Sequence, residues 1–451
     1  MKINLITIEN LFDIFHYEIA VKPNENVLII TGPNGYGKTT ILNIIFNLFN
    51  RNFLFFQKLV FEKITLVLDE NIKIIIIKTV KDDQKRLFDE NRESDNKHTI
   101  NFLFYQGEVV LENLNYVLEL ENTIGRIIEN YLPIRRIAPN TWIELGTGNN
   151  NILNTDDVLI EFADQLPDEV TKNISRITSK KANEILNSIQ VHLIKEQRLF
   201  KKTIVQKHER SFLREDKTQT VMVDAIQTYA DDLKQLIRDI SQKSFIQTQE
   251  LDSSYPKRLT NENNILQQNE YEKKFNALKD KQQRLTHFGL YESKQEFLNY
   301  NKNDAKALSV YLKDFEQKLS VFDELLEKLE LFSNILNERR FTFKSIKINR
   351  SKGFYFETVK GKELELGQLS SGEQHEVVLL YELIFNVKPD VLVLIDEPEI
   401  SLHVSWQKEF LSDLLKIVKI QKIQVLVATH SPSIINDRWD LVYNLEAPKI
   451  K

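Results

Sequence analysis

Residues 30–40 read Ile-Thr-Gly-Pro-Asn-Gly-Tyr-Gly-Lys-Thr-Thr, and this stretch decides the fold. It matches the pattern Gly-x-x-x-x-Gly-Lys-Thr of a phosphate-binding loop, with Lys38 and Thr39 in register. A short apolar run at residues 27–30 predicts a buried strand before the loop, and apolar residues at helical spacing follow it. A chance glycine turn would not supply this spacing, the lysine, the threonine and both flanking elements together. The stretch therefore predicts a strand, a glycine loop and a helix that cradle a phosphate group.

The chemistry of such a loop assigns a role to each residue type. The glycines let successive backbone N–H groups point inwards at the β-phosphate, and the helix that begins near Lys38 adds its positive dipole end. We expect Lys38 to reach the β- and γ-phosphates of ATP and the Thr39 hydroxyl to coordinate Mg²⁺. The predicted nucleotide-binding residues are Asn34, Gly35, Tyr36, Gly37, Lys38, Thr39 and Thr40.

Composition excludes several classes of protein. The 451 residues include no cysteine, which rules out disulfides and thiolate metal sites. A formal net charge of −5 gives no overall attraction to nucleic acid. The chain does not open with a basic segment and a long apolar run, and apolar runs such as residues 74–77 and 391–395 are too short to span a bilayer. We expect a cytoplasmic protein without membrane contact.

The pattern of apolar residues predicts a head domain that is split along the chain. Strands are expected at residues 2–8, 17–21, 27–30, 65–68, 72–77, 99–105 and 108–111. The charged run from 81 to 98 is expected to be a loop or a hairpin tip. Strands return at 341–348 and 354–359. We therefore assign residues 1–200 to the N-terminal part of the head, 201–340 to an insertion, and 341–451 to the C-terminal part of the head.

The insertion has a helical pattern. Apolar residues recur in steps of three and four from 223 to 241, and again from 308 to 336. This periodicity predicts either an antiparallel coiled-coil hairpin or two ordinary amphipathic helices packed on the head. Basic residues gather between 172 and 214, which is typical of a solvated helical face or of a DNA contact.

Two later motifs are expected to complete a nucleotide site. Residues 367–374 read Gly-Gln-Leu-Ser-Ser-Gly-Glu-Gln before an apolar helix, which taken alone is typical of a helix cap. Residues 390–398 read Asp-Val-Leu-Val-Leu-Ile-Asp-Glu-Pro, an apolar strand that ends in two carboxylates, as in a Walker B motif. A buried parallel strand would deliver both carboxylates beside the phosphate loop. We expect Asp396 to hold Mg²⁺ through water and Glu397 to orient and polarise the attacking water.

The order of these motifs resembles the ABC-type heads of SMC and recombination-repair ATPases. More closely, it is similar to bacterial ATPases of the overcoming-lysogenization type and their antiphage-defence relatives, of which the ATPase subunits of the PARIS and Septu systems are nearest in size and layout. The loop at 32–42, Leu-Ser-Ser-Gly-Glu-Gln at 369–374 and Ile-Asp-Glu-Pro-Glu-Ile-Ser-Leu-His at 395–403 carry the resemblance. It covers both parts of the head, whereas the insertion matches only in being helical. A transporter subunit is disfavoured, because the insertion is too long.

The resemblance implies an α/β fold: an ABC-type ATPase head with a parallel sheet, an antiparallel β lobe and a helical or coiled-coil insertion. It implies ATP hydrolysis with Glu397 and His430 as catalytic residues, His430 being the switch histidine at the γ-phosphate. It also implies a homo-oligomer, a dimer of heads or a hexamer, in which the signature of one protomer covers the ATP of another. The signature residues are Ser370, Ser371, Gly372 and Glu373, and Gln197 is the Q-loop candidate. Ser371 departs from the glycine that transporters have.

The same resemblance predicts the partners. About twenty residues follow His430, too few for the nuclease domain that overcoming-lysogenization nucleases carry after the ATPase. We therefore expect an ATPase that acts as sensor and scaffold in antiphage defence and controls a separate effector protein, a nuclease or toxin, with a phage-encoded trigger. The alternative is an SMC-like DNA-repair ATPase, in which DNA is the partner.

Overall fold

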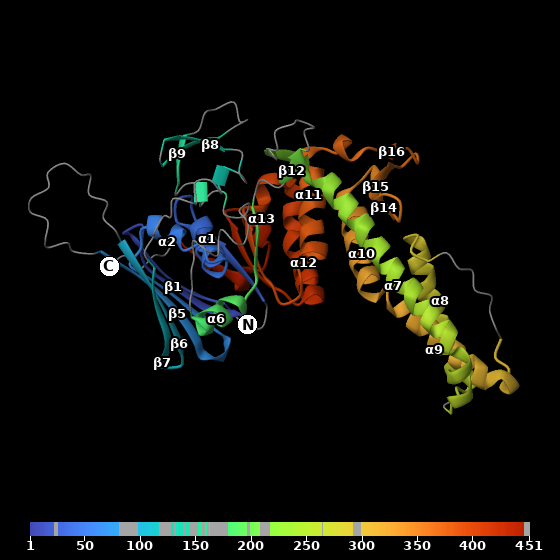
Figure 1. Ribbon diagram of the computed structural model, residues 1–451. Helices are drawn as coiled ribbons and strands as arrows, with labels where there is room; N and C mark the ends of the chain where they lie inside the picture. The colour runs from blue at the N-terminus through green and yellow to red at the C-terminus, as the bar shows by residue number, and fades with distance from the viewer. Residues whose placement is uncertain are drawn as a thin grey trace, which may run out of the picture. The chain divides into compact units, whose positions relative to one another are not determined.

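The computed structural model describes most of the chain. The described residues are 1–21, 26–80, 98–116, 128–129, 132, 134–138, 140–144, 152–155, 158–159, 162, 179–195, 199–207, 217–263, 265–291 and 299–445. Contacts between residues divide the chain into two units. The head unit comprises Met1–Val223 and Val387–Lys451, and the helical unit comprises Asp224–Asn386. Figure 1 shows both units.

A parallel sheet forms the centre of the head unit. Its strands follow the order β11 (Val191–Ile194), β17 (Leu392–Asp396), β18 (Gln424–Thr429), β3 (Val27–Thr31) and β19 (Val442–Asn444). All four neighbouring pairs are parallel. The strands β17 and β18 are buried along almost their whole length, which explains their continuous apolar sequence, since a parallel sheet is covered on both faces.

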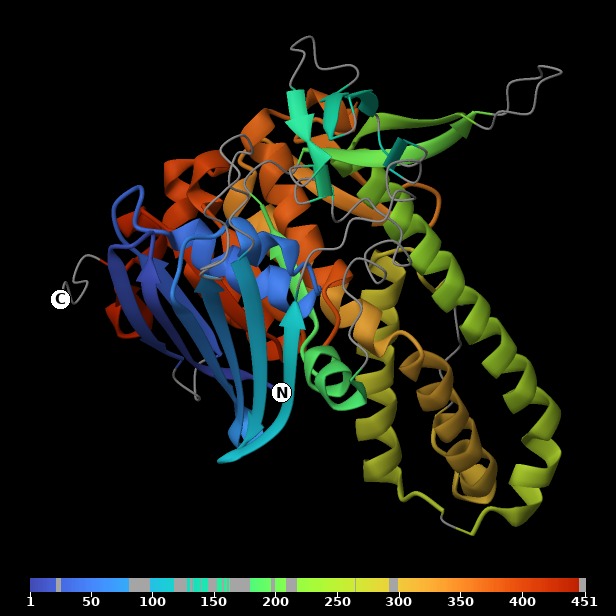
Figure 2. The ribbon, with the colours of Figure 1, turned by 60° about the vertical axis from the view of Figure 1, so that its left-hand side comes forward.

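An antiparallel sheet forms the second layer of the head unit. It has the order β2 (Phe15–Ala20), β1 (Ile3–Leu11), β4 (Lys63–Leu68), β5 (Ile72–Val80), β6 (His98–Gln106) and β7 (Val109–Tyr116). Helix α1 (Lys38–Phe49) follows the phosphate loop, and its apolar side shares one hydrophobic core with residues of both sheets. Figure 2 shows the curved antiparallel sheet with α1 beside it. The core thus anchors the helix that carries Lys38 and Thr39.

Smaller elements complete the head unit. Its other helices are α2 (Leu54–Lys58), α6 (Lys180–Asn187), α12 (Val404–Gln421) and α13 (Pro432–Ile435). A three-stranded sheet contains β8 (Ile134–Ala138), β9 (Thr141–Glu144) and β10 (Ile152–Asn154), and a hairpin contains β12 (Phe200–Lys207) and β13 (Lys217–Asp224). No strand was predicted at 200–207 or 217–224 from the sequence. Among the described residues, no helix has the length and apolar character needed to cross a membrane.

The described residues of the helical unit form five α-helices and a small β lobe. Four of these helices are α7 (Ala225–Asn261), α8 (Gln268–His287), α9 (Ala305–Ser320) and α10 (Asp323–Ile335), and α9 contacts both α7 and α8. The β lobe contains β14 (Lys344–Asn349), β15 (Gly353–Thr358) and β16 (Glu363–Leu364), and α11 (Ser371–Tyr381) follows it. The apolar series from 308 to 336 is buried as expected, but two helices carry it, because the chain turns at residues 321–322.

The predicted α/β class is confirmed, with a parallel sheet, an antiparallel sheet and a helical insertion. The strands predicted in residues 2–111 are all present, within a few residues of their expected ends. The charged run from 81 to 98 lies outside the described residues except for its last position. Residues 341–386, which we expected in the C-terminal part of the head, have most of their contacts within the helical unit. The division at 200 and 340 stays a prediction.

Candidate functional site

The phosphate loop joins the end of β3 to the start of α1. Gly37 is the residue before the helix and has a φ of 86°, in the left-handed region that favours glycine. A Cβ atom at this position would also lie 3.0 Å from Cδ2 of Leu11. The buried Lys38 ammonium donates hydrogen bonds to the carbonyl oxygens of Gly32 at 2.9 Å and Pro33 at 3.2 Å. The loop therefore curls around the ammonium group that we expect to meet phosphate.

Tyr17 on β2 holds the loop from outside. Its hydroxyl donates to the carbonyl oxygen of Tyr36 at 2.8 Å. Burial raises the pKa of the Tyr17 hydroxyl far above its ordinary value, and the neighbouring Tyr36 and Tyr443 phenols raise it further. The group thus remains a hydrogen-bond donor at any physiological pH. No sequence signal singled out Tyr17, because the contact joins two separate segments.

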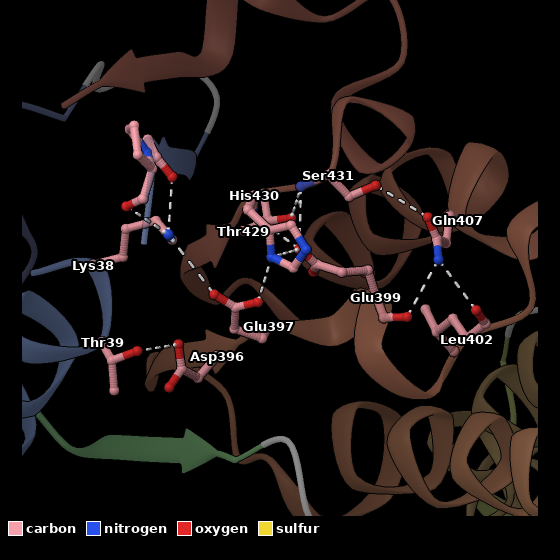
Figure 3. A network of polar contacts seen from close by, with 12 residues as sticks. Lys38, Thr39, Asp396, Glu397, Glu399, Leu402, Gln407, Thr429, His430 and Ser431 are labelled. Carbon is pink, nitrogen blue, oxygen red and sulfur yellow. Dashed lines mark hydrogen bonds and ion pairs between the residues drawn. The ribbon is translucent and has the colours of Figure 1, made fainter. Parts of the chain in front are cut away.

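The parallel sheet brings the second motif to the loop. Asp396 is the last residue of β17, and its Oδ1 accepts a hydrogen bond from the Thr39 hydroxyl at 3.1 Å. These two oxygens come from elements far apart in the sequence, yet they lie side by side (Figure 3). Mg²⁺ prefers oxygen ligands of this kind. The donor set at this position therefore fits the cation that the sequence predicts there.

Glu397 lies between a lysine and a histidine. Its Oε1 is 3.8 Å from Nζ of Lys38, and its Oε2 is 2.5 Å from Nδ1 of His430 (Figure 3). Its backbone has φ 45° and ψ 57°, a left-handed conformation that is uncommon for a residue other than glycine and costs about 1–2 kcal/mol. The Glu397 N–H donates to the carbonyl oxygen of Ala428 at 2.9 Å, which helps to hold this conformation.

A second glutamate, Glu399, also faces the histidine. His430 follows the end of β18, and its Nδ1 lies 3.1 Å from Oε1 of Glu399. Among the described residues, Glu397, Glu399 and His430 form a group whose ligand atoms lie within 4.8 Å of one another. In the sequence, Glu399 stood out only as part of the stretch 395–403 that carries the resemblance, and no role was predicted for it. The buried side chain of Glu399 belongs to this site.

The signature motif begins helix α11 in the helical unit. The exposed Ser370 is the N-cap residue, and it forms a capping box with Glu373. Lys344 donates to Oε2 of Glu373 at 2.9 Å. Burial alone would raise the pKa of the Glu373 carboxyl, but hydrogen bonds from Lys344 and Ser370 outweigh it and hold this pKa below its ordinary value. Glu373 therefore stays ionised and stabilises the helix start.

The structure brings most of the predicted residues together. Within the head unit, the phosphate loop, Asp396, Glu397 and His430 converge on one edge of the parallel sheet. Residues 370–373 belong to the helical unit. Gln197 lies outside the described residues, although β11, a few residues before it, is the parallel neighbour of β17. The Q-loop assignment stays a prediction.

Comparison with known proteins identifies the family to which the chain belongs. No curated protein matches the chain. Similar solved structures include the Smc head domain with an extended coiled coil from Pyrococcus furiosus, bound to the C-terminal domain of ScpA. It is 12% identical, with a TM-score of 0.32, over 96% of this chain and 90% of that chain. The SMC head domain from Thermotoga maritima is 11% identical, with a TM-score of 0.33, over 98% and 94%. Residues 1–435 match the family described as AAA ATPase domain. This match spans both segments that form the candidate site, and the chain belongs to the AAA ATPase domain family.

Proposed function

We propose that this chain is a Mg²⁺-dependent ATPase that works as a nucleotide-driven switch. One observation carries the proposal: the phosphate loop, the Walker B carboxylates and a histidine converge at one edge of the parallel sheet. Each group has the chemistry that phosphoryl transfer to water needs, namely a cation site, a phosphate cradle and a base beside them.

The geometry supports a division of labour among these groups. Lys38 and the loop amides would bind the phosphates, while the Thr39 and Asp396 oxygens would hold Mg²⁺, which neutralises charge on the phosphates when bound. Glu397 would accept a proton from the attacking water. His430 touches this carboxylate and would orient it while it contacts the γ-phosphate.

We further propose that the site is completed by a second copy of the chain. Ser370 and Ser371 are exposed at the start of α11, an 11-residue helix whose N-terminal amides favour an anion. These groups would cover the γ-phosphate of the ATP held by the partner protomer. The expected assembly is a homo-oligomer built from dimers of heads, as a dimer or a hexamer.

Mixing two inactive variants tests both proposals. Lys38→Ala should lose ATP binding, and Ser370→Arg should bind ATP but not hydrolyse it. In a mixed dimer one composite site remains intact, so activity should partly return, while either variant alone stays inactive. No recovery after mixing has been verified would contradict the arrangement in trans. Wild-type protein that fails to hydrolyse Mg·ATP would contradict the ATPase.

We propose that the switch serves a cytoplasmic antiphage defence system. The support is the resemblance of the motifs at 32–42, 369–374 and 395–403 to those of defence ATPases. An ATPase of this kind biases a conformational equilibrium, and a second protein must respond to that bias. The second protein would be a nuclease or toxin, held inactive until a phage component triggers its release.

Co-expression with the neighbouring gene tests this role. We expect a small effector to co-purify, and we expect protection in a plaque assay to require both the effector and Glu397. Full protection by this chain alone, or the absence of a co-purifying neighbour, would contradict the scaffold role. DNA binding that weakens steeply with salt would instead favour the SMC-like repair ATPase.

A further inference from the structure

Glu399 is a buried carboxylate that none of the roles above uses. Glu399 lies two residues after Glu397 of the Walker B motif, and it is 6% exposed. Its Oε1 accepts hydrogen bonds from the Thr429 hydroxyl at 2.5 Å, the His430 N–H at 2.8 Å and the Ser431 N–H at 3.1 Å. A buried carboxylate is costly unless donors compensate it, so this arrangement is a specific one. One oxygen atom holds the backbone of the turn that carries the histidine.

The same oxygen also contacts the histidine ring. Nδ1 of His430 lies 2.5 Å from Oε2 of Glu397 and 3.1 Å from Oε1 of Glu399. An ionised carboxylate accepts hydrogen bonds and donates none, so a contact with two ionised carboxylates favours the form in which Nδ1 carries the hydrogen atom. The ring is thus held between two carboxylates, and this contact sets its tautomer. Nε2 remains as the nitrogen for any contact beyond the pair.

Gln407 on α12 provides a second link between the same segments. Its Nε2 donates to the carbonyl oxygens of Glu399 at 3.2 Å and Leu402 at 3.1 Å, and its Oε1 accepts from the Ser431 hydroxyl at 3.0 Å (Figure 3). The turn at 429–431 is therefore tied to residues 399–402 through both the side chain and the main chain of Glu399. A movement of one segment must strain these bonds or move the other.

The tied segment reaches the surface beside the site. Ile400, in the middle of residues 398–402, is 59% exposed although it is apolar. A nucleotide that displaces His430 would therefore strain or move residues 398–402, of which Ile400 is exposed. This path consists of hydrogen bonds rather than of proximity alone.

We propose that Glu399 is a positioning residue: it holds His430 against Glu397 and, with Gln407, couples the turn at 429–431 to residues 398–402, of which Ile400 is exposed. The proposal rests on the proposed ATPase function for its kinetic consequence. Its structural part, the grip of Glu399 on the turn, requires no nucleotide. The two parts are tested separately.

Hydrogen exchange tests the grip on the turn. In Glu399→Ala, the His430 amide loses its acceptor and should exchange about tenfold faster or more, without nucleotide. The Ser431 amide keeps the Thr429 hydroxyl oxygen as a second acceptor at 3.0 Å, so its exchange should rise less. Glu399→Gln keeps one acceptor oxygen and should retain most of the protection. Glu9→Gln is the matched control, because Glu9 lies on β1 of the same unit and pairs with Lys63 at 3.0 Å. Unchanged exchange in Glu399→Ala would overturn the proposal.

A double-mutant cycle tests whether Glu399 acts through His430. Loss of an outer group that orients a functional side chain typically costs about 10- to 100-fold. We expect Glu399→Ala to lower kcat by this factor, with the Kd for ATP changed less than about threefold. In a His430→Ala background, the same substitution should lower kcat less than about twofold, because the group it positions is absent.

Each outcome of the cycle shows whether Glu399 acts through His430. An equal loss in both backgrounds, or an unchanged kcat, would overturn the positioning role. Glu399→Gln keeps an acceptor oxygen for the turn but loses the negative charge 3.1 Å from Nδ1 of His430, and it serves if Glu399→Ala does not fold. It should lower kcat about tenfold, again only when His430 is present. Wild-type protein without ATPase activity would contradict the proposed function, while the exchange experiment would still decide the contact.

Discussion

Glu397→Gln should stop hydrolysis without weakening ATP binding. The substitution keeps the size of the side chain and removes its charge. Oε1 lies 3.8 Å from Nζ of Lys38, where two unit charges attract by about 4 kcal/mol at an effective dielectric constant of about 20. Without this carboxylate, Lys38 loses a competitor for the phosphates, so the Kd for ATP should stay the same or fall.

The expected loss of rate follows from the role of the carboxylate. A general base contributes about 10²- to 10⁴-fold, which corresponds to about 2.7–5.4 kcal/mol of transition-state stabilisation. Single-turnover hydrolysis of Mg·ATP measures the chemical step, and calorimetry measures the Kd. The control is Glu272→Gln, which removes one charge on the exposed face of α8 in the other unit.

Two results would refute this reasoning. Hydrolysis within about tenfold of wild type would show that Glu397 is not the base. An ATP affinity lowered together with the rate would show that its carboxylate binds the nucleotide complex in the ground state, for example through the cation.

Three further predictions concern the cation, the core and the helix cap. Asp396→Asn should raise the Mg²⁺ concentration needed for half-maximal hydrolysis about tenfold or more. The Kd for ATP measured by calorimetry without Mg²⁺ should not change. A normal Mg²⁺ requirement would contradict the assignment of Asp396 as a residue that holds the cation. Ile44 is fully buried on α1, so Ile44→Ala should lower the free energy of unfolding in urea by about 2–5 kcal/mol. A loss below about 1 kcal/mol, which is roughly the cost of a substitution at the surface, would contradict the place of Ile44 in the core. The pKa of Glu373 is lower in the folded than in the unfolded protein, so its stabilisation is present above the unfolded value of about 4.3 and is lost as the pH falls through the folded value. The difference in melting temperature between wild type and Glu373→Gln should therefore shrink on acidification below about pH 4.3, and a difference that grows would contradict this sign.

The local motifs were predictable, because each motif consists of residues that are neighbours in the sequence. The loop around Lys38 and the pair Asp396 and Glu397 each combine a strand signal with a short pattern, and the structure places them together. The rule that ligands meet at the carboxyl ends of parallel strands then predicts that these groups share one edge of the sheet.

Contacts between distant segments were not predictable in this way. Glu399 meets the turn at 429–431 only after β17 and β18 pair, so no local pattern announces its role. The break at residues 321–322 was missed for a different reason. Both α9 and α10 keep their apolar residues at steps of three and four, so the spacing runs through the turn unchanged. Periodicity reports burial more faithfully than it reports helix ends.

The position of β3 in its sheet has a consequence for biogenesis. Its two neighbours, β18 and β19, are translated about 400 residues later, which at about 5–20 residues per second means a delay of tens of seconds or more. During this time the apolar strand before the phosphate loop has no partner in its sheet and is a natural target for chaperones. The contiguous helical unit can meanwhile fold from its own residues. The strand that leads into the phosphate loop therefore gains its parallel neighbours only after most of the residues between them have been translated.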